Sequence, residues 1–233
     1  MRFDIVTLFP DCFTSVLNSG LIGKALAKQI ANVHFVNPRD FTTDKHRKVD
    51  DEPYGGGVGM LMKPGPIFSA VESLPTLQRR EVIMMSPQGE TINQPLLREL
   101  AGNYDQIVII CGHYEGVDER VLELVTREVS LGDFILTGGE IPSMALINGV
   151  VRLLPGTVGI AESLKLESFE EGLLDFPPIH PSRNLPRPQS TRCIIIRQPC
   201  SNCTVAIRAT NCQNPQTSSR FISSMGRGEG EGE

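Results

Sequence analysis

The feature that most constrains the fold is the alternation of short apolar runs with helix-like segments over residues 1–177. Strand-like segments separated by helices favour a sheet whose strands are mostly parallel. The sequence therefore predicts an α/β fold, with helices flanking a mostly parallel sheet. The strand-like runs read F-D-I-V-T-L-F, V-H-F-V, E-V-I-M-M-S, Q-I-V-I-I-C and D-F-I-L, and they begin at residues 3, 33, 81, 106 and 133.

Three stretches between these runs have helical spacing. Asp11 is predicted as the N-cap of a helix whose apolar side extends from Phe13 to Leu26. Residues 117–125 carry a second helical pattern. Thr137 and Glu140 form a T-x-x-E pattern, typical of a capping box, before a helix over 141–154 that ends at a Pro-Gly pair.

The composition changes after residue 177. Residues 178–233 contain no Asp, no Lys and a single Leu, but four of the six cysteines. Such a segment buries too little apolar surface to offset the entropy of ordering it, so we expect a mostly disordered tail and a domain boundary after residue 177. Its one C-x-x-C pair leaves a zinc site as an alternative, but the irregular spacing favours incidental thiols. The cysteines concerned are Cys193, Cys200, Cys203 and Cys212.

Composition also limits the classes of protein. No apolar run approaches the roughly 18 residues that a membrane helix needs, and Asp4 and Pro10 make the N-terminus a poor secretory signal. These features predict a cytoplasmic protein without a membrane partner. The net charge of −5 argues weakly against broad nucleic-acid binding, although a local basic patch can override it.

Three strand-like runs end in glycine-bearing turns, at 84–90, 109–116 and 130–140. If the strands are parallel, the turns share the carboxyl edge of the sheet, where open α/β sheets bind ligands. Neither G-x-x-x-x-G-K-[ST] nor G-x-G-x-x-G occurs in them, so a triphosphate or a Rossmann dinucleotide is not indicated. Backbone groups and small or apolar side chains suit a flat heterocycle, and Glu115 and Asp133 suit a cationic ligand. His113 is predicted to be a turn residue without a catalytic role.

Four motifs carry a family resemblance. C-G-H-Y-E-G-V-D-E-R, S-L-G-D-F-I-L-T-G-G-E-I-P, P-Y-G-G-G-V-G-M-L-M and E-S-F-E-E-G-L-L-D-F-P resemble the bacterial tRNA (guanine-N1)-methyltransferase family of the SPOUT class, over residues 1–177. The resemblance implies a trefoil-knotted domain, a homodimer, S-adenosyl-L-methionine as methyl donor, and methylation of N1 of the guanosine 3′ of the tRNA anticodon, position 37. It also implies which residues bind the donor. These are Ser86, Pro87, Gln88, Gly112, Tyr114, Glu115, Gly116, Leu131, Gly132, Asp133, Phe134, Ile135, Leu136, Gly138, Gly139 and Pro142.

The resemblance also implies two catalytic residues. Guanine N1 is a weak nucleophile until its proton leaves, so the reaction needs a base near N1 and a cation near the exocyclic oxygen. Glu167 matches the position of the family's aspartate base, and Arg152 matches the family's arginine. A dependence on Mg²⁺ is expected from the family, but no dedicated ligand cluster is recognisable. Residues 44–48 form a basic stretch that the resemblance assigns to contact with tRNA or the partner subunit.

The tail fits a shift of reading frame. Codons permitted by residues 178–181, read one base later, can encode Q-Y-T followed by R. Those permitted by residues 188–207 can encode L-K-V-P-D-V-L-L-S-G-N-H-A-A-I-A-Q-W-R, which resembles the start of the family's helical tRNA-binding domain. We therefore interpret the tail as an out-of-frame replacement of that domain, and expect impaired activity of the chain as written.

Two other functions remain open on the sequence. One is a non-catalytic nucleotide-binding module whose Cys-rich tail binds zinc or a partner. The other is a SPOUT methyltransferase that acts on a different RNA, which the length of the resemblance disfavours.

Overall fold

The computed structural model describes residues 1–160, 163–164 and 167–169. The chain divides into two units, Met1–Ala161 and Glu162–Glu233. The predicted boundary after residue 177 and the expected disorder of the tail lie outside the described residues. Within the described ranges, no helix is both long and apolar enough to cross a membrane.

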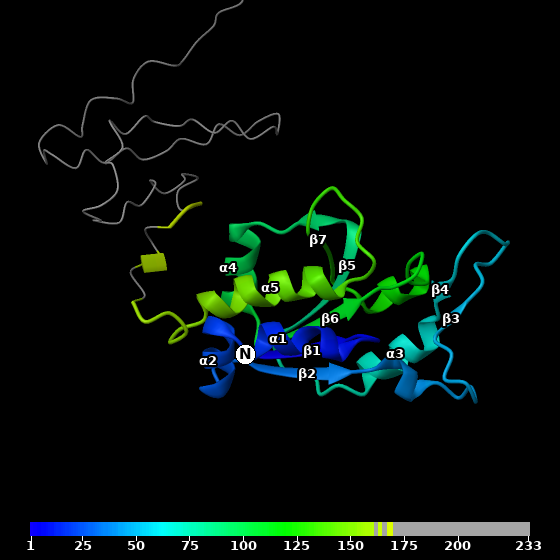
Figure 1. Cartoon of the computed structure of the whole chain (residues 1–233), viewed down its shortest axis with the longest axis horizontal. Coiled ribbons are helices and arrows are strands. Elements are labelled where there is room, and N and C mark those ends of the chain that lie inside the picture. The colour runs from blue at the N-terminus through cyan, green and yellow to red at the C-terminus, as the bar shows by residue number, and fades with distance from the viewer. Residues whose placement is uncertain (161–162, 165–166, 170–233) are drawn as a thin grey trace, which may run out of the picture. The chain divides into compact units, whose positions relative to one another are not determined.

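The first unit is built on a five-stranded sheet with the order β2-β1-β6-β5-β7, in which every neighbouring pair is parallel (Figure 1). A separate antiparallel pair joins β3 and β4. The α/β class predicted from the sequence is therefore confirmed. The strands are β1 (Arg2–Val6), β2 (Asn32–Val36), β3 (Asp50–Asp51), β4 (Leu61–Met62), β5 (Arg80–Thr91), β6 (Gln106–Cys111) and β7 (Arg127–Ser130). The helices are η1 (Pro10–Phe13), α1 (Thr14–Leu17), α2 (Gly20–Ala27), η2 (Pro38–Phe41), α3 (Pro64–Glu72), α4 (Gln94–Asn103), η3 (Glu119–Leu124) and α5 (Glu140–Leu153).

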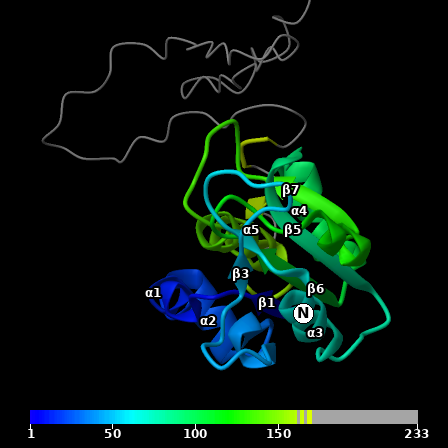
Figure 2. The same ribbon diagram turned by 90° about the vertical axis from the view of Figure 1, so that its right-hand side faces the viewer.

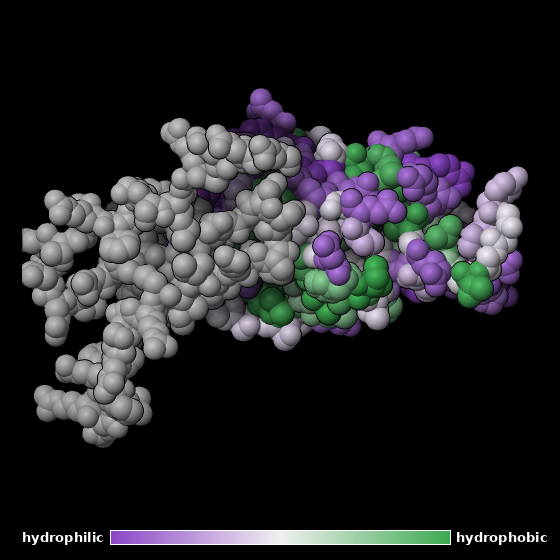
Figure 3. Space-filling model, turned by 90° about the horizontal axis from the view of Figure 1, so that it is seen from above, coloured by the Kyte–Doolittle hydropathy of each residue, from purple (hydrophilic) through white to green (hydrophobic). Residues whose placement is uncertain are grey.

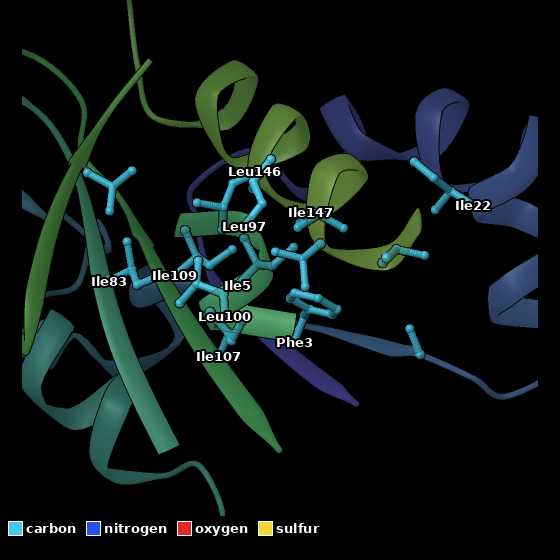
Figure 4. Packing of buried hydrophobic residues seen from close by; sticks show 14 of the residues in the cluster. Phe3, Ile5, Ile22, Ile83, Leu97, Leu100, Ile107, Ile109, Leu146 and Ile147 are labelled. Atoms are coloured by element: carbon cyan, nitrogen blue, oxygen red, sulfur yellow. The ribbon is translucent and has the colours of Figure 1, made fainter. Parts of the chain in front are cut away.

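The central strand β6 is buried along its whole length because both faces of the sheet are covered. Successive side chains of a strand point to opposite faces. Ile107 and Ile109 accordingly join the core beneath α1, α2, α4 and α5, together with Leu146 of α5 (Figure 4). Val108 and Ile110 join the second core, beneath α3 and η3. The arrows of β2 and β6 point to the right in Figure 1, so Figure 2 looks toward the carboxyl ends of these strands.

The helix predicted from Asp11 to Leu26 is wrong as a single element, since it is divided into η1, α1 and α2. Ser19 donates its hydroxyl to the carbonyls of Ser15 and Val16, which closes the end of α1. Gly20 then has φ +59°, a left-handed conformation that glycine adopts without a steric penalty. Phe9, and not Asp11, is the N-cap of η1.

Three further predictions of elements need correction. The run D-F-I-L is not a strand. The strand in this region is instead β7, Arg127–Ser130, which precedes that run. It ends where Ser130 Oγ accepts a 3.1 Å hydrogen bond from the backbone N–H of Gly132. The helical pattern over 117–125 is a 3₁₀ helix over Glu119–Leu124. The predicted capping box is wrong too, because Gly139 is the N-cap of α5 and makes no side-chain cap. The helix itself, predicted over 141–154, is confirmed as Glu140–Leu153.

Candidate active site at the carboxyl edge of the sheet

A cavity of about 450 Å³ lies at the carboxyl edge of the sheet. This volume lies within the range of about 300 to 1,000 Å³ that small-molecule sites occupy. Its walls come from β5, where the register with β7 shifts between Met85 and Glu90, from the turn after β6 and from the segment between β7 and α5. The lining residues are 84–87, 112–117, 129–132, 134–139 and Pro142. The structure therefore brings together the three turns that the sequence placed at one sheet edge.

The turn after β6 is fixed by backbone hydrogen bonds to the segment before and within β4. Glu115 N–H donates to the carbonyl of Met60 at 3.0 Å, and Met62 N–H donates to the carbonyl of Gly116 at 3.0 Å. Tyr114 is held at φ +62°, a conformation that non-glycine residues rarely adopt and that is often found at functional sites. The turn therefore presents an exposed tyrosine ring to the cavity from a strained but well-supported backbone.

The two glycines before α5 allow close approach to β6. A Cβ atom on Gly139 would lie 2.7 Å from Cα of Cys111, and one on Gly138 would overlap the imidazole of His113. The backbone is tied there too, since Gly139 N–H donates to the carbonyl of Gly112 at 3.0 Å. Both glycines line the cavity, so they bring α5 against β6 and leave the backbone open to a ligand.

A buried polar network lies behind this wall. His113 Nε2 lies 2.8 Å from Glu140 Oε2, and Thr7 Oγ1 donates to Glu140 Oε1 at 2.7 Å. The Phe9 ring packs on His113 with a centroid separation of 4.8 Å. His113, predicted only as a turn residue, lines the cavity.

Charge at the cavity is sparse and negative. Glu115 lines it, is exposed, and has no basic side chain within 4.0 Å among the described residues. Cys111 is buried beside Ser143, and this burial raises the pKa of its thiol far above the usual range. In the described ranges, no three His, Cys, Asp or Glu side chains are grouped so that they could hold a metal ion.

Basic residues lie near the exposed tyrosine of the cavity. Arg39 Nη2 donates a long hydrogen bond of 3.5 Å to Tyr114 Oη, and its Nη1 contacts the carbonyl of Arg47 at 3.4 Å. Arg47 is paired with Asp40. The backbone N–H of Lys48 donates to Asp44 and lowers the pKa of that carboxyl. The basic stretch at 44–48 is therefore internally ordered, and through Arg39 it is linked to the cavity.

The tRNA (Guanine-1)-methyltransferase TrmD family matches residues 1–195 of the chain. The chain belongs to this family. It is 86% identical over 177 residues to a tRNA (guanine-N(1)-)-methyltransferase from Nostoc sp., covering 76% of this chain and 70% of that protein. It is 72% identical over 177 residues to the protein of the same description from Synechocystis sp., with 76% of each chain covered.

A solved structure shares the fold of this family member. The crystal structure of tRNA (m1G37) methyltransferase from Aquifex aeolicus superposes with a TM-score of 0.62 at 42% identity, covering 69% of this chain and 72% of that one. The family resemblance seen in the sequence is thus confirmed, together with its α/β fold. The trefoil knot that the resemblance implies stays a prediction.

Most residues predicted to bind the methyl donor line the cavity, and their role in binding it stays a prediction. Gln88 and Asp133 do not line it, and both are exposed. Arg152 lies in the last turn of α5 and does not line the cavity, and Glu167 lies in a bend of the second unit. The predicted residues that do line it are Ser86, Pro87, Gly112, Tyr114, Glu115, Gly116, Leu131, Gly132, Phe134, Ile135, Leu136, Gly138, Gly139 and Pro142.

Some lining residues of this family member were not predicted. Met84 and Met85 continue the apolar run of β5, and Val129 and Ser130 belong to β7. For Val129 and Ser130 the available signal was the end of the strand, since the last residues of parallel strands face the same edge as the turns after them. Apart from its place in the turn, no local signal indicated that His113 lines the cavity. Glu140, which it contacts, and Thr7, which contacts Glu140, lie far away in the sequence.

Proposed function

We propose that this chain transfers a methyl group from S-adenosyl-L-methionine to N1 of the guanosine at position 37 of tRNA. The observation that carries the proposal is the cavity at the carboxyl edge of the sheet, lined by the family motifs of a chain that belongs to the methyltransferase family. Family membership favours this enzyme over a non-catalytic nucleotide-binding module. It also favours it over a methyltransferase acting on another RNA.

The cavity suits the methyl donor in size, polarity and charge. Glycines at 138 and 139 leave backbone groups accessible, which suits the hydrogen-bonding edge of adenine. Apolar side chains at 134–136 suit the faces of the ring. Glu115, without a basic partner among the described residues, suits a ligand with positive charge. When bound, the donor supplies an electrophilic methyl group on a sulfonium.

The chain's own residues would prepare the acceptor. Glu167 would take the N1 proton of guanine, and Arg152 would stabilise the negative charge that develops on the exocyclic oxygen. Glutamate is one methylene longer than the aspartate of the family motif. Mg²⁺ would assist the loss of the proton, a role that the resemblance alone supports.

The position of Arg152 supports a homodimer. It lies near the far end of α5 from Glu140, a separation of about 18 Å along the axis at a rise of about 1.5 Å per residue. Pro142, the last residue of α5 that lines the cavity, is about 15 Å from Arg152 along the axis, which is farther than an arginine side chain reaches. A second copy would bring its own Arg152 to the site, so we propose that each active site uses residues of two subunits.

Exposed apolar side chains near the cavity also support the homodimer. Phe134, Ile135 and Ile141 are exposed, and the space-filling view shows apolar patches among polar ones (Figure 3). Clustered exposed apolar side chains mark interaction sites in soluble proteins. We propose that the second copy covers them.

The test is methyl transfer from labelled S-adenosyl-L-methionine to a tRNA transcript with guanosine at position 37. The matched control is the same transcript with adenosine there. Label on the first alone supports the proposal, even at the low rate expected of a chain with a replaced tRNA-binding domain, and label on neither or on both contradicts it. Glu167→Gln should lower the rate by about 10²- to 10⁴-fold, the usual contribution of a general base, while Glu167→Asp should retain activity.

The tail requires a second experiment, because we propose that it is an out-of-frame replacement of the family's tRNA-binding domain. Two observations support this proposal: the relatives align over 177 or 178 residues, and the composition changes after residue 177. Resequencing the coding DNA from the codon for Leu174 to that for Cys203 tests the frame. An extra or missing base there would support the interpretation. An unchanged sequence with full turnover of tRNA would contradict it.

A further inference from the structure

Glu140 is a buried carboxylate that uses both of its oxygens at the cavity wall. It is only 6% exposed, and its oxygens contact His113 Nε2 at 2.8 Å and Thr7 Oγ1 at 2.7 Å. A carboxylate only accepts hydrogen bonds, so His113 donates from Nε2. Thr7 is also buried, and its oxygen accepts a 3.0 Å hydrogen bond from the backbone N–H of Phe9.

The contacts of Glu140 join three separate segments. Thr7 directly follows β1, His113 belongs to the turn after β6, and Glu140 begins α5. A β-bridge between His113 and Gly138 runs beside the same contact. Gly138 must lack a side chain there, since a Cβ atom would overlap the imidazole of His113 and approach Glu140 Oε2 to 2.6 Å. The network therefore fixes the spacing between two walls of the cavity.

We infer that Glu140 is a positioning residue for methyl-donor binding: through His113 and Thr7 it holds the turn after β6 and the glycines before α5 at the separation that the donor requires. This inference rests on the proposed function. Glu140 does not itself line the cavity, whereas His113 and Gly138 do. Loss of the charge-assisted hydrogen bonds should therefore act on the affinity for the donor by changing the width of the cavity.

A second buried carboxylate provides a matched control. Glu81 is 5% exposed and is paired with Arg127 at 3.1 Å, as Glu140 is paired with His113. It lies at the start of β5, at the opposite end of the sheet from the cavity. Neutralising either residue removes a buried ionic hydrogen bond, but only Glu140 lies behind the cavity wall.

The experiment is calorimetric titration of S-adenosyl-L-methionine into the full chain, with thermal unfolding measured on the same samples. Glu140→Gln should weaken binding by on the order of tenfold, the loss expected from one charge-assisted hydrogen bond. Glu81→Gln should lower Tm comparably while the Kd stays within about twofold of the unmodified chain. Thr7→Val should weaken binding of the donor, whereas Thr7→Ser, which keeps the hydroxyl, should bind it as the unmodified chain does. The effects of Thr7→Val and Glu140→Gln should not add, because both substitutions break the same network.

The inference is overturned if Glu140→Gln binds as tightly as the unmodified chain, or if Glu81→Gln weakens binding as much. Should Glu140→Gln fail to fold, the Thr7→Val and Thr7→Ser pair decides, since Thr7 keeps its backbone hydrogen bond to Val36 in both. If the unmodified chain does not bind the donor at all, the proposed function fails and the inference falls with it. Normal binding by the unmodified chain with unchanged binding by the variants overturns the inference alone.

Discussion

Gly139 lies so close to Cys111 that a Cβ atom on Gly139 would be 2.7 Å from the Cα atom of Cys111. The φ angle of Gly139 is −79°, which alanine adopts without strain, so only the contact excludes a side chain. We expect Gly139→Ala to lower the free energy of unfolding by about 1 to 3 kcal/mol, the usual cost of overpacking. The measurement is urea unfolding followed by circular dichroism.

The control for Gly139→Ala is Gly102→Ala in α4, where an added Cβ meets nothing within 4 Å. This change should stabilise the chain by about 0.5 to 1 kcal/mol, since alanine costs less entropy than glycine in a helix. Equal effects of the two substitutions would show that the contact with Cys111 does not exclude a side chain.

Arg127 holds three glutamates together at the edge of the sheet. It contacts Glu81 at 3.1 Å, Glu90 at 3.0 Å and Glu99 at 2.6 Å. Arg127→Met should cost about 3 kcal/mol of stability, because it leaves the buried Glu81 without its charged partner. Adding Glu81→Gln should recover a large part of that loss. A double variant no more stable than Arg127→Met would contradict this account.

Cys111 should make the fold sensitive to alkaline pH. Burial raises the pKa of its thiol in the folded state, whereas in the unfolded chain the thiol titrates near 8.5. The unfolded chain therefore binds fewer protons above that pH, and stability falls there by up to about 1.4 kcal/mol per pH unit. Below about pH 8.5 the thiol is protonated in both states and contributes no slope.

The check is urea unfolding of the unmodified chain and of Cys111→Ala between pH 7 and 10. Cys111→Ala should show the shallower alkaline decline, while Cys12→Ala, at an exposed cysteine, should match the unmodified chain. Parallel declines for Cys111→Ala and the unmodified chain would exclude Cys111 as the cause.

Ile141 provides a test of the proposed homodimer. It is 54% exposed at the second position of α5, where an aspartate suits the helix dipole and spares the fold. Ile141→Asp should shift the chain from dimer to monomer in light scattering. Leu21→Asp, at the second position of α2 and 40% exposed, is the matched control and should leave the dimer intact. Identical masses for both variants would argue against an interface at Ile141.

The sheet was predictable from the sequence because the local apolar pattern alone indicates its buried central strands. The run 107–111 is apolar and is buried on both faces, as expected for a central strand of a parallel sheet. The run D-F-I-L misled because its apolar residues are exposed on a surface loop, and apolar pattern does not distinguish a core from an interface. Glu140 misled for another reason: its hydrogen bond to Thr7 spans 133 positions, and this distant contact displaced the local capping box.

The location of the candidate site at the carboxyl edge of the sheet was predictable from the sequence. Parallel strands run in one direction, so the register shift within β5 and the turns after β6 and β7 meet at one edge of the sheet. The chemistry was not predictable in the same way, since the residue pattern alone does not distinguish Arg152 and Glu167 from ordinary helix and bend residues, and only the family resemblance indicates a role for them.

Because β6 is completely buried, the cavity wall attached to it should move less than the exposed rim of the cavity at residues 134–136. The inner wall is bound to β6 by the hydrogen bond from Gly139 to Gly112, so its amides should exchange with solvent only when the whole unit opens. The outer rim at 134–136 is exposed and belongs to no helix or strand, so its amides should exchange within local fluctuations. Ligands would thus enter by displacing the rim while the inner wall stays in place.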